Sequence, residues 1–390
     1  MVVGHPGDRR VAFVQAALAR LGQAPAEVIA YRDLLDGRDS LTAALRPGCL
    51  VRLESPGRDF EVEKRLIALG AAEPETEDTA AAFIDAAAAL RLEADRGRLR
   101  YIRQWYRGFR ALLRRLRNEA AGVRGVRFLN HPDDVAAMFD KRLCQARFAA
   151  AGVPVPARLG SVGSFDGLLE RMRAANRPRV FVKLAHGSAA AGAVALAVGG
   201  PRLRAVTTVE MVRTNSELAL YTTRRLRVYE SAAEVAPLID ALCREGVQAE
   251  AWVPKAGVDG YGFDLRVLVV AGRPRHTVAR LSRTPMTNLH LLNPRGDLDR
   301  VRAAVPPDRW AAAMASAVRA ARQFPASHAV GVDLLFAPGC RRHFVLEANA
   351  FGDLLPGVLC DGRDAYEDEL ALFQRSEGRG QRSDQPFADL

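Results

Sequence analysis

The sequence predicts a mixed α/β (α+β) chain of three packed units, at residues 1–127, 128–246 and 247–374, followed by a disordered tail at 375–390. Three observations lead to this fold class. A length of 390 residues suits two or three domains. A hydrophobic fraction of 49% supplies real cores and excludes disorder as the main state. Over residues 1–90, short apolar stretches alternate with amphipathic ones, which favours a parallel sheet.

The first unit opens with the apolar residues 1–3, and residues 28–31 and 49–53 predict two further strands. Helical periodicity at 11–21 and 60–69 predicts helices that cover the sheet. Gly4 and Gly7 follow the first strand but do not complete a GxGxxG pattern. A dinucleotide site is therefore not indicated.

Residues 72–118 are expected to be mostly helical, and arginines recur along them at steps of three and four, which places them on one helix face. The set is Arg96, Arg100, Arg103, Arg107, Arg110, Arg114 and Arg117. The window Arg96–Arg127 holds eleven arginines and one acid, so it carries nearly all of the chain's net charge of +11. Two interpretations stay open. One is a solvated face of a packed helix; the other is a docking surface for an acidic partner, either an acidic peptide or a nucleic acid such as tRNA.

In the second unit a helix is expected at 133–151, ended by the Gly-Val-Pro-Val-Pro stretch at 152–156, and strands at 180–184 and 193–198. In the third unit the predicted strands are 247–253, 265–270, 276–281, 330–336 and 344–348, with a helix at 309–323.

Several protein classes are excluded by the same sequence. No apolar run approaches the ~20 residues that span a bilayer, so no membrane partner is expected. The N-terminus lacks the pattern of a signal peptide. The five cysteines are scattered without a CxxC pair, which indicates neither a zinc site nor a disulfide framework and fits a cytoplasmic location.

The last predicted hairpin carries the strongest chemical signal. If Phe336 pairs with Phe344, then Asp333 faces Glu347 across the ladder and Asn349 lies on the same face. Two facing carboxylates in apolar strands repel each other and lose hydration. A divalent cation removes both penalties, and three oxygen donors suit Mg²⁺. The alternative is a pair of carboxylates exposed to water at the sheet edge.

The lysines are rare, since only Lys64, Lys141, Lys183 and Lys255 occur among 56 basic residues. Lys183 stands in an apolar strand, ahead of a loop of small residues at 186–192 whose amides could approach phosphate oxygens. Lys141 alone is typical of a surface helix, Lys64 of a solvated helix, and Lys255 of an exposed loop. No Ser/His/Asp or Cys/His constellation is evident among the seven dispersed histidines.

Together these motifs resemble the ATP-grasp superfamily over about residues 128–358. The resemblance is carried by five motifs in the expected order: Asn130-His131-Pro132 with Asp140-Lys141, the Lys183 strand with its loop, Gln248 to Pro254, Asp264-Leu265-Arg266, and Asp333 with Glu347-Ala348-Asn349. It implies an N-terminal Rossmann-like pre-ATP-grasp domain followed by a two-lobed ATP-grasp fold. The most similar subgroup is the ligases that modify peptides or amino acids, of the glutamate-ligase type.

The resemblance also implies roles for individual residues. ATP phosphates would be bound by Lys141 and Lys183 with the loop residues His186, Gly187 and Ser188. Adenine would contact the linker residues Glu250, Ala251, Trp252 and Val253, and the ribose would contact Asp264. Arg266 and Arg280 would face the transferred phosphoryl group or the substrate carboxylate. Asp333, Glu347 and Asn349 would hold one or two Mg²⁺ ions, with Mn²⁺ as the alternative. The linker departs from the family at Ala251, where an acid is usual.

The implied activity is an ATP-dependent carboxylate–amine ligase that forms a C–N bond through an acyl phosphate and releases ADP and phosphate. Two other classes stay open: a nucleic-acid-binding protein that uses the Arg96–Arg127 segment, and a non-catalytic ATP-binding regulator. The sequence names neither the acid nor the amine, and it leaves a homodimer open.

Overall fold

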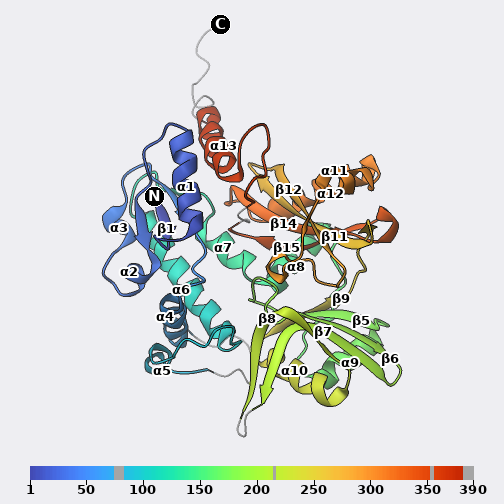
Figure 1. Ribbon diagram of the computed structural model, residues 1–390. Helices are drawn as coiled ribbons and strands as arrows, with labels where there is room; N and C mark the ends of the chain where they lie inside the picture. The colour runs from blue at the N-terminus through green and yellow to red at the C-terminus, as the bar shows by residue number, and fades with distance from the viewer. Residues whose placement is uncertain (74–82, 214–216, 352–354, 381–390) are drawn as a thin grey trace.

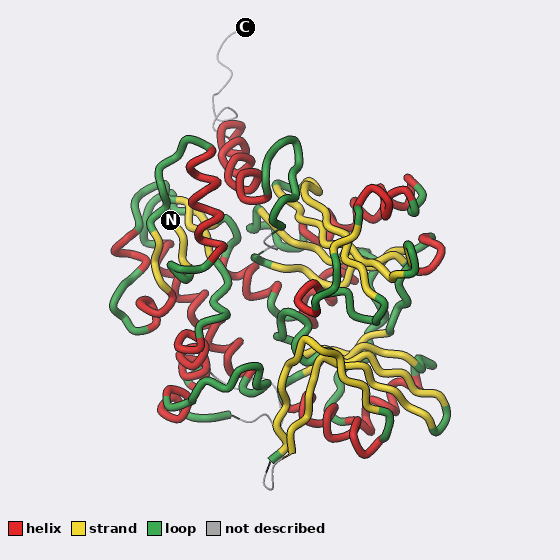
Figure 2. The backbone as a smooth tube through the Cα atoms, in the orientation of Figure 1, coloured by secondary structure: helices red, strands yellow, loops and turns green. Residues whose placement is uncertain are grey.

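The computed structural model describes residues 1–73, 83–213, 217–351 and 355–380. It contains three sheets, each with its own helices (Figures 1 and 2). In Figure 1 the N-terminal unit lies on the left, the C-terminal lobe at the upper right and the central lobe at the lower right. The expected mixed α/β class is confirmed.

The N-terminal unit is built on a four-stranded parallel sheet in the order β2-β1-β3-β4, as the alternation of elements predicted. Its strands are β1 (Val2–Gly4), β2 (Val28–Ala30), β3 (Leu50–Leu53) and β4 (Arg127–Phe128). Its helices are α1 (Arg9–Arg20), α2 (Tyr31–Leu35), α3 (Leu41–Ala44), α4 (Phe60–Ala71), α5 (Ala86–Leu90) and α6 (Ile102–Ala121).

The arginine-rich segment is not one helix, which corrects the sequence prediction. Helix α6 begins at Ile102, because Tyr101 adopts a left-handed backbone conformation with φ of 58°. Arg96 and Arg100 therefore precede the helix. The segment before α6 lies along the central lobe instead, where Leu99 donates its amide to the Leu220 carbonyl.

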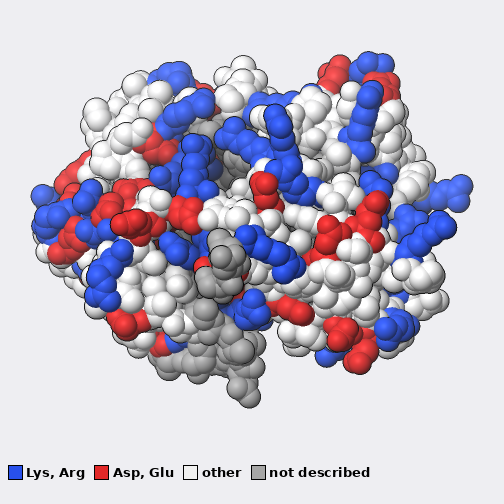
Figure 3. All heavy atoms as spheres, turned by 60° about the horizontal axis from the view of Figure 1, so that its bottom comes forward, with Lys and Arg blue, Asp and Glu red and all other residues white. Residues whose placement is uncertain are grey.

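Several arginines of α6 are buried or paired with acids, unlike the side chains of a helix face that is only solvated. Arg103 is buried. Arg114 pairs with Glu73 at 2.7 Å and Arg117 with Asp133 at 3.0 Å, so acids distant in sequence offset the local charge. Figure 3 shows basic and acidic side chains interleaved over much of the face that it turns forward. Arg114 and Arg117 are therefore paired with acids of the protein itself.

The helix expected at 133–151 is divided in two, α7 (Pro132–Met138) and α8 (Lys141–Ala150). The first helix ends at Met138 with Phe139 as its C-cap. Asp140 caps the second, since its side chain accepts hydrogen bonds from the Arg142 and Leu143 amides. An aspartate at this position satisfies amide groups that have no partner within the helix. The break makes Lys141 the first residue of α8.

The central lobe is a five-stranded antiparallel sheet in the order β8-β7-β6-β5-β9. The predicted strands 180–184 and 193–198 appear as the adjacent pair β5 (Arg179–Leu184) and β6 (Val194–Gly199). A long hairpin that the sequence did not predict follows, β7 (Arg202–Arg213) and β8 (Leu218–Tyr229). The lobe is completed by α9 (Phe165–Ala174), α10 (Ala232–Arg244) and β9 (Val247–Ala251).

The C-terminal lobe is a six-stranded sheet in the order β13-β12-β11-β14-β15, with β10 paired to β11. Its strands are β10 (Gly257–Val258), β11 (Tyr261–Val270), β12 (Arg273–Ser282), β13 (Arg295–Gly296), β14 (Ala329–Phe336) and β15 (His343–Asn349). Its helical elements are η1 (Leu289–Leu291), α11 (Leu298–Ala303), α12 (Pro307–Ala321) and η2 (Pro338–Cys340).

The register of β14 and β15 brings Asp333 opposite Glu347, as predicted, although the pairing at the turn end of the hairpin differs from the predicted one. Phe336 pairs with His343 and not with Phe344. A bulge between Asp333 and Leu334 restores the predicted pairing further along the ladder.

Helix α13 (Ala365–Gly380) runs through 375–380, which were expected to belong to a disordered tail. The rest of that tail, 381–390, lies outside the described residues. No helix within the described part of the chain combines the length and apolar character needed to cross a bilayer.

Candidate functional site

The N-terminus of α8 meets the loop after β5 and the last hairpin. The Lys141 amide donates to the Ala185 carbonyl at 3.0 Å, and its ammonium group donates to the Gly187 carbonyl. The same Nζ lies 3.7 Å from Oε2 of Glu347 on β15. Lys141 therefore stands between the small-residue loop of the central lobe and a carboxylate of the C-terminal lobe, two of the features that sequence reasoning assigned to one site.

Lys183 lies on β5, the strand that precedes the small-residue loop. Its ammonium group is bonded to the carboxylate of Glu250 on the adjacent strand β9. Glu250 is buried, and Gln145 and Gln248 donate to its other oxygen at 3.1 and 2.8 Å. Burial lowers the pKa of Lys183, but Glu250 and Glu347 outweigh it and hold that pKa above its usual value. The Lys183 ammonium therefore stays charged.

The loop expected to cover phosphates, 186–192, is a series of tight turns. Ala189 and Ala190 have φ of 53° and 61°, and Gly192 has 69°. A side chain at Gly192 would run into Leu184, so this glycine allows the loop to pack closely on β5. Gly187 and Ser188 lie at the start of the loop, and Ser188 is exposed.

His186 is held from outside the loop. Its ring stacks on Tyr106 of α6, with centroids 3.9 Å apart and an interplanar angle of 13°. Its Nε2 lies 3.4 Å from Oδ2 of Asp140, beside Lys141. Burial lowers the pKa of His186. Tyr106 was missed by sequence reasoning, because nothing local connects two residues 80 positions apart.

The linker expected to contact adenine has one amide available. The Ala251 and Trp252 amides already donate to the Ala157 and Arg179 carbonyls. The Val253 amide donates to no acceptor within the described residues. Trp252 packs edge-on against Phe181 at 5.5 Å, so the linker offers an aromatic surface beside that amide.

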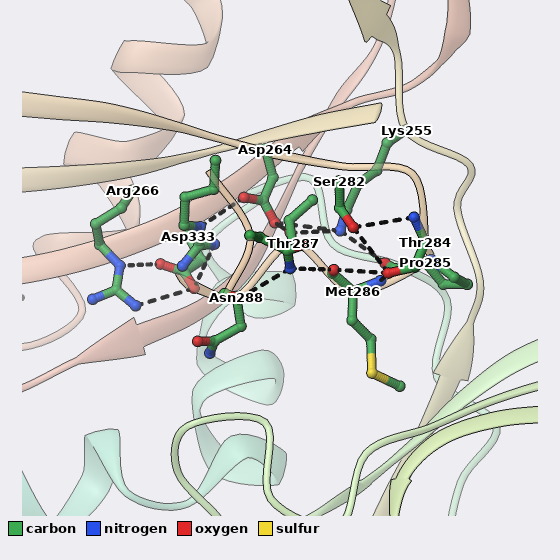
Figure 4. Close-up of polar contacts among 12 residues, drawn as sticks. Lys255, Asp264, Arg266, Ser282, Thr284, Pro285, Met286, Thr287, Asn288 and Asp333 are labelled. Carbon is green, nitrogen blue, oxygen red and sulfur yellow. Dashed lines mark hydrogen bonds and ion pairs between the residues drawn. The ribbon is translucent and has the colours of Figure 1, made fainter. Parts of the chain in front are cut away.

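The core of the C-terminal lobe's site is a buried network of acids and arginines (Figure 4). Both oxygens of Asp333 accept from Arg266, and Oδ2 also accepts from Arg280 at 3.0 Å. Arg280 donates through Nε to Asp264 at 2.7 Å. Burial raises the pKa of Asp333, but the two arginines outweigh it and hold that pKa well below its usual range. The Asp333 carboxylate therefore stays ionised between its two arginines.

Lys255 is part of this network, which corrects the expectation of an exposed loop residue. Its side chain is 13% exposed, and its ammonium donates to the Pro285 carbonyl at 3.0 Å and to the Thr287 hydroxyl at 2.8 Å. It lies 3.4 Å from Oδ2 of Asp264, which Thr287 also contacts. With Arg280 on the other oxygen, Asp264 is occupied by protein groups. This arrangement argues against Asp264 as the ribose contact.

The three expected metal ligands can be tested by their donor capacity. Glu347 is only partly buried, and its one ion pair within the described residues is the 3.7 Å contact with Lys141. Asn349 donates its amide to Gly331 at 3.4 Å, so its oxygen remains an acceptor. Asp333 keeps one lone pair on Oδ1 after its three arginine bonds. The donor set fits Mg²⁺, mainly through Glu347 and Asn349.

No protein-family profile and no curated protein matches the chain. Solved structures do. The ATP-grasp ligase PsnB, complexed with a phosphomimetic variant of its minimal precursor, Mg and ADP, has a TM-score of 0.54 at 17% identity, over 96% of this chain and 97% of that one. The D-cycloserine synthetase DcsG has 0.54 at 15%, over 96% and 98%. The macrocyclase MdnC of Microcystis aeruginosa MRC, bound with precursor peptide MdnA, has 0.52 at 12%, over 96% and 100%. These likenesses show that the chain has the ATP-grasp fold.

Proposed function

We propose that this chain, which has the ATP-grasp fold, is an ATP-dependent carboxylate–amine ligase acting on a peptide. The observation that carries the proposal is the convergence of Lys141 and Lys183, from two elements of the central part, on the acidic face of the β14–β15 hairpin. Two cations opposite Glu347 and Asp333 provide what a nucleotide triphosphate with its metal requires.

The reaction has two steps. A carboxylate oxygen of the substrate attacks the γ-phosphorus of ATP, the bond to ADP breaks, and an acyl phosphate forms. The amine then attacks the acyl carbon, phosphate leaves with the bonding electrons, and the amine loses a proton to form the amide. Nothing in this sequence requires a protein nucleophile, since the protein positions reactants and neutralises charge.

Each site residue has a role in that scheme. Lys141 and Lys183 hold the phosphates, with the 186–192 loop over them. Trp252 and the Val253 amide contact adenine. Arg280, whose Nη1 donates to no described residue, reaches the phosphoryl group or the substrate carboxylate, and Arg266 holds Asp333 in place. Asp333, Glu347 and Asn349 would hold Mg²⁺, which supplies charge neutralisation at the phosphates.

The peptide substrate is supported by the neighbours, because the MdnC structure contains a precursor peptide and the PsnB structure contains a variant of its minimal precursor. A peptide with an acidic side chain and an amine would supply both reacting groups. The cytoplasm, where ATP is abundant, is the proposed location, and the five cysteines are free in the structure.

The test is ADP and phosphate release with Mg²⁺, measured over peptides that carry acidic and amino side chains. Hydroxylamine should trap the acyl phosphate as a hydroxamate. Glu347→Gln should reduce turnover by at least 100-fold, roughly the loss expected for one group aimed at developing charge. Glu170→Gln, on an exposed position of α9, is the matched control and should turn over like the wild type.

Wild-type turnover in Glu347→Gln would contradict the metal assignment. ADP release without any hydroxamate, across acidic peptides and free amino acids, would contradict the ligase chemistry and favour another phosphoryl acceptor.

A further inference from the structure

The loop between β12 and β13, residues 283–294, leaves the C-terminal lobe and packs on the central lobe. Met286 is buried in a cluster with Ala193 and Ala195 of the central sheet, and Trp252 and Leu291 border the same cluster. The loop therefore bridges the two lobes next to the aromatic surface assigned to adenine.

Several hydrogen bonds within the 283–294 loop fix its shape. Asn293 donates its amide to the Met286 and Asn288 carbonyls at 2.8 and 3.0 Å, and the Thr284 hydroxyl donates to the Met286 carbonyl at 3.1 Å. These bonds shape the turn, but they do not attach it to either sheet.

The two ends of the loop are tied to β12, because the Leu281 amide donates to the Pro294 carbonyl and the Thr284 amide donates to the Ser282 hydroxyl. At its start, Arg283 also lies over the ring of Tyr261 on β11.

The middle of the loop is attached to the C-terminal sheet through the Lys255 ammonium group (Figure 4). Lys255 donates to Pro285 and Thr287 of the loop, and the same Nζ lies 3.4 Å from Asp264 on β11. A lysine carries three N–H donors, and these three acceptors match that number. The Thr287 hydroxyl adds its own bond to Asp264. Lys255 and Thr287 thus join the loop to a buried carboxylate of the sheet.

We propose that Lys255 is a positioning residue that holds the 283–294 loop between the two lobes and thereby keeps Met286 beside the Trp252 surface assigned to the nucleotide. The nucleotide part rests on the proposed function, whereas the attachment of the loop does not. Loss of the ammonium group would free the loop to leave the central lobe and would open the apolar side of the pocket.

Opening of the loop can be detected by proteolysis at an arginine within it. Arg283 is exposed at the start of the loop, and trypsin cleaves after arginine only when the backbone around it opens. Lys255→Met preserves the length of the side chain and removes both hydrogen bonds and the ion pair with Asp264. We expect cleavage after Arg283 at native conditions, identified by fragment mass, to be roughly tenfold faster or more, because cleavage follows the population of the open loop.

Two further variants make the result specific. Lys64→Met removes an ion-paired surface lysine on α4 and should leave cleavage after Arg283 unchanged. Thr287→Val removes the hydroxyl between Lys255 and Asp264 without removing the charge, and should also speed cleavage. If Lys255→Met does not fold, Thr287→Val decides the question. Wild-type cleavage rates in the folded variants would overturn the proposal.

The nucleotide arm uses steady-state kinetics of ADP release. Lys255→Met should raise the KM for ATP several-fold, since the wall of the nucleotide pocket is loosened. If Lys255→Met speeds cleavage of the loop but leaves the KM for ATP unchanged, the role of Lys255 in attaching the loop stands. The proposed link between the loop and the nucleotide is then overturned. If no turnover is found in any protein, the proposed function fails, while the proteolysis result still decides the role of Lys255.

Discussion

Asp333 has two roles, of which the sequence indicated only one. It is a candidate metal ligand on β14, and it is the counterion of two arginines that are themselves buried. Removing a carboxylate in this position does not only empty a metal site. It also leaves two guanidinium groups in a medium of low dielectric without their main partner.

Asp333→Ala is therefore expected to lose about 3–5 kcal/mol of unfolding free energy, the usual cost of removing one partner of a buried pair. Urea denaturation followed by circular dichroism measures it. Asp308→Ala removes an exposed acid of α12 whose side chain is 70% accessible, and should change stability by less than about 0.5 kcal/mol. A loss below about 1 kcal/mol in Asp333→Ala would mean that water or other groups compensate Arg266 and Arg280.

For single residues, the sequence pattern predicted contacts between neighbouring strands but not contacts that depend on how distant elements pack. Pairing the two strands placed Asp333 opposite Glu347, although the assumed pairing of Phe336 with Phe344 was off by one residue and a bulge made up the difference. The sequence pattern could not place Lys255, because that side chain is enclosed by a loop that starts 28 residues downstream. Nor could it find Tyr106, whose contact with His186 depends on how α6 packs against the central lobe.

Among the elements, helices α4 and α6 cross at two glycines. A Cβ at Gly108 would collide with the Leu66 carbonyl, and one at Gly70 would collide with the Gln104 carbonyl. The two backbones touch because neither position has a side chain. This close crossing holds α6, and with it Tyr106, at its place beside the phosphate loop.

Gly108→Ala should accordingly be destabilising, although alanine favours helices elsewhere. The clash forces the helices apart, and overpacking of this kind costs about 1–3 kcal/mol or more. Gly122→Ala is the control, since the nearest atom to its added Cβ lies at an ordinary 3.6 Å. Thermal unfolding compares the two variants. A stabilised Gly108→Ala would show that the crossing relaxes at little cost.

Elements were predictable where one face is apolar and the other polar. The helix at 60–69 follows that rule. Strand β14 is buried along its whole length and was predictable from its run of apolar residues instead. The β7–β8 hairpin was missed because exposed and buried positions do not alternate along it. Arg224 and Arg225 are exposed neighbours, and the apolar Val212 and Val228 are exposed as well. The break between α7 and α8 did have a signal, since Asp140 is a favourable cap, but the apolar periodicity continues across it.

The whole molecule is held by two main cores that do not coincide with the three sheets. One core joins the N-terminal unit to the C-terminal lobe, through residues such as Val3, Phe109, Val135 and Val332. The central lobe has a core of its own, with Val182, Leu196 and Leu238 at its centre. The central lobe is thus the part able to unfold, or to move, by itself.

One carboxylate joins that lobe to the rest of the protein. Glu245, at the end of α10, accepts hydrogen bonds from the Tyr101 and Ile102 amides at 2.8 Å each and so caps the N-terminus of α6. Charged acceptors at a helix N-terminus are stabilising because they meet both the unpaired amides and the helix dipole. The cap joins an element of one core to an element of the other. Its loss should therefore reduce the cooperativity between the two cores more than it reduces the stability of either core alone.

Glu245→Ala is expected to cost about 1–2 kcal/mol and to separate calorimetric unfolding into two transitions, with the central lobe melting first, about 4 °C or more below the rest. Glu230→Ala, which removes an exposed acid from the same lobe, should keep the wild-type profile. The argument depends on the cores being distinct. If Glu245→Ala lowers a single, still cooperative transition, the strand pairing of Leu99 with Leu220 and the packing of Ile102 against the central core are enough to make one unit of the two.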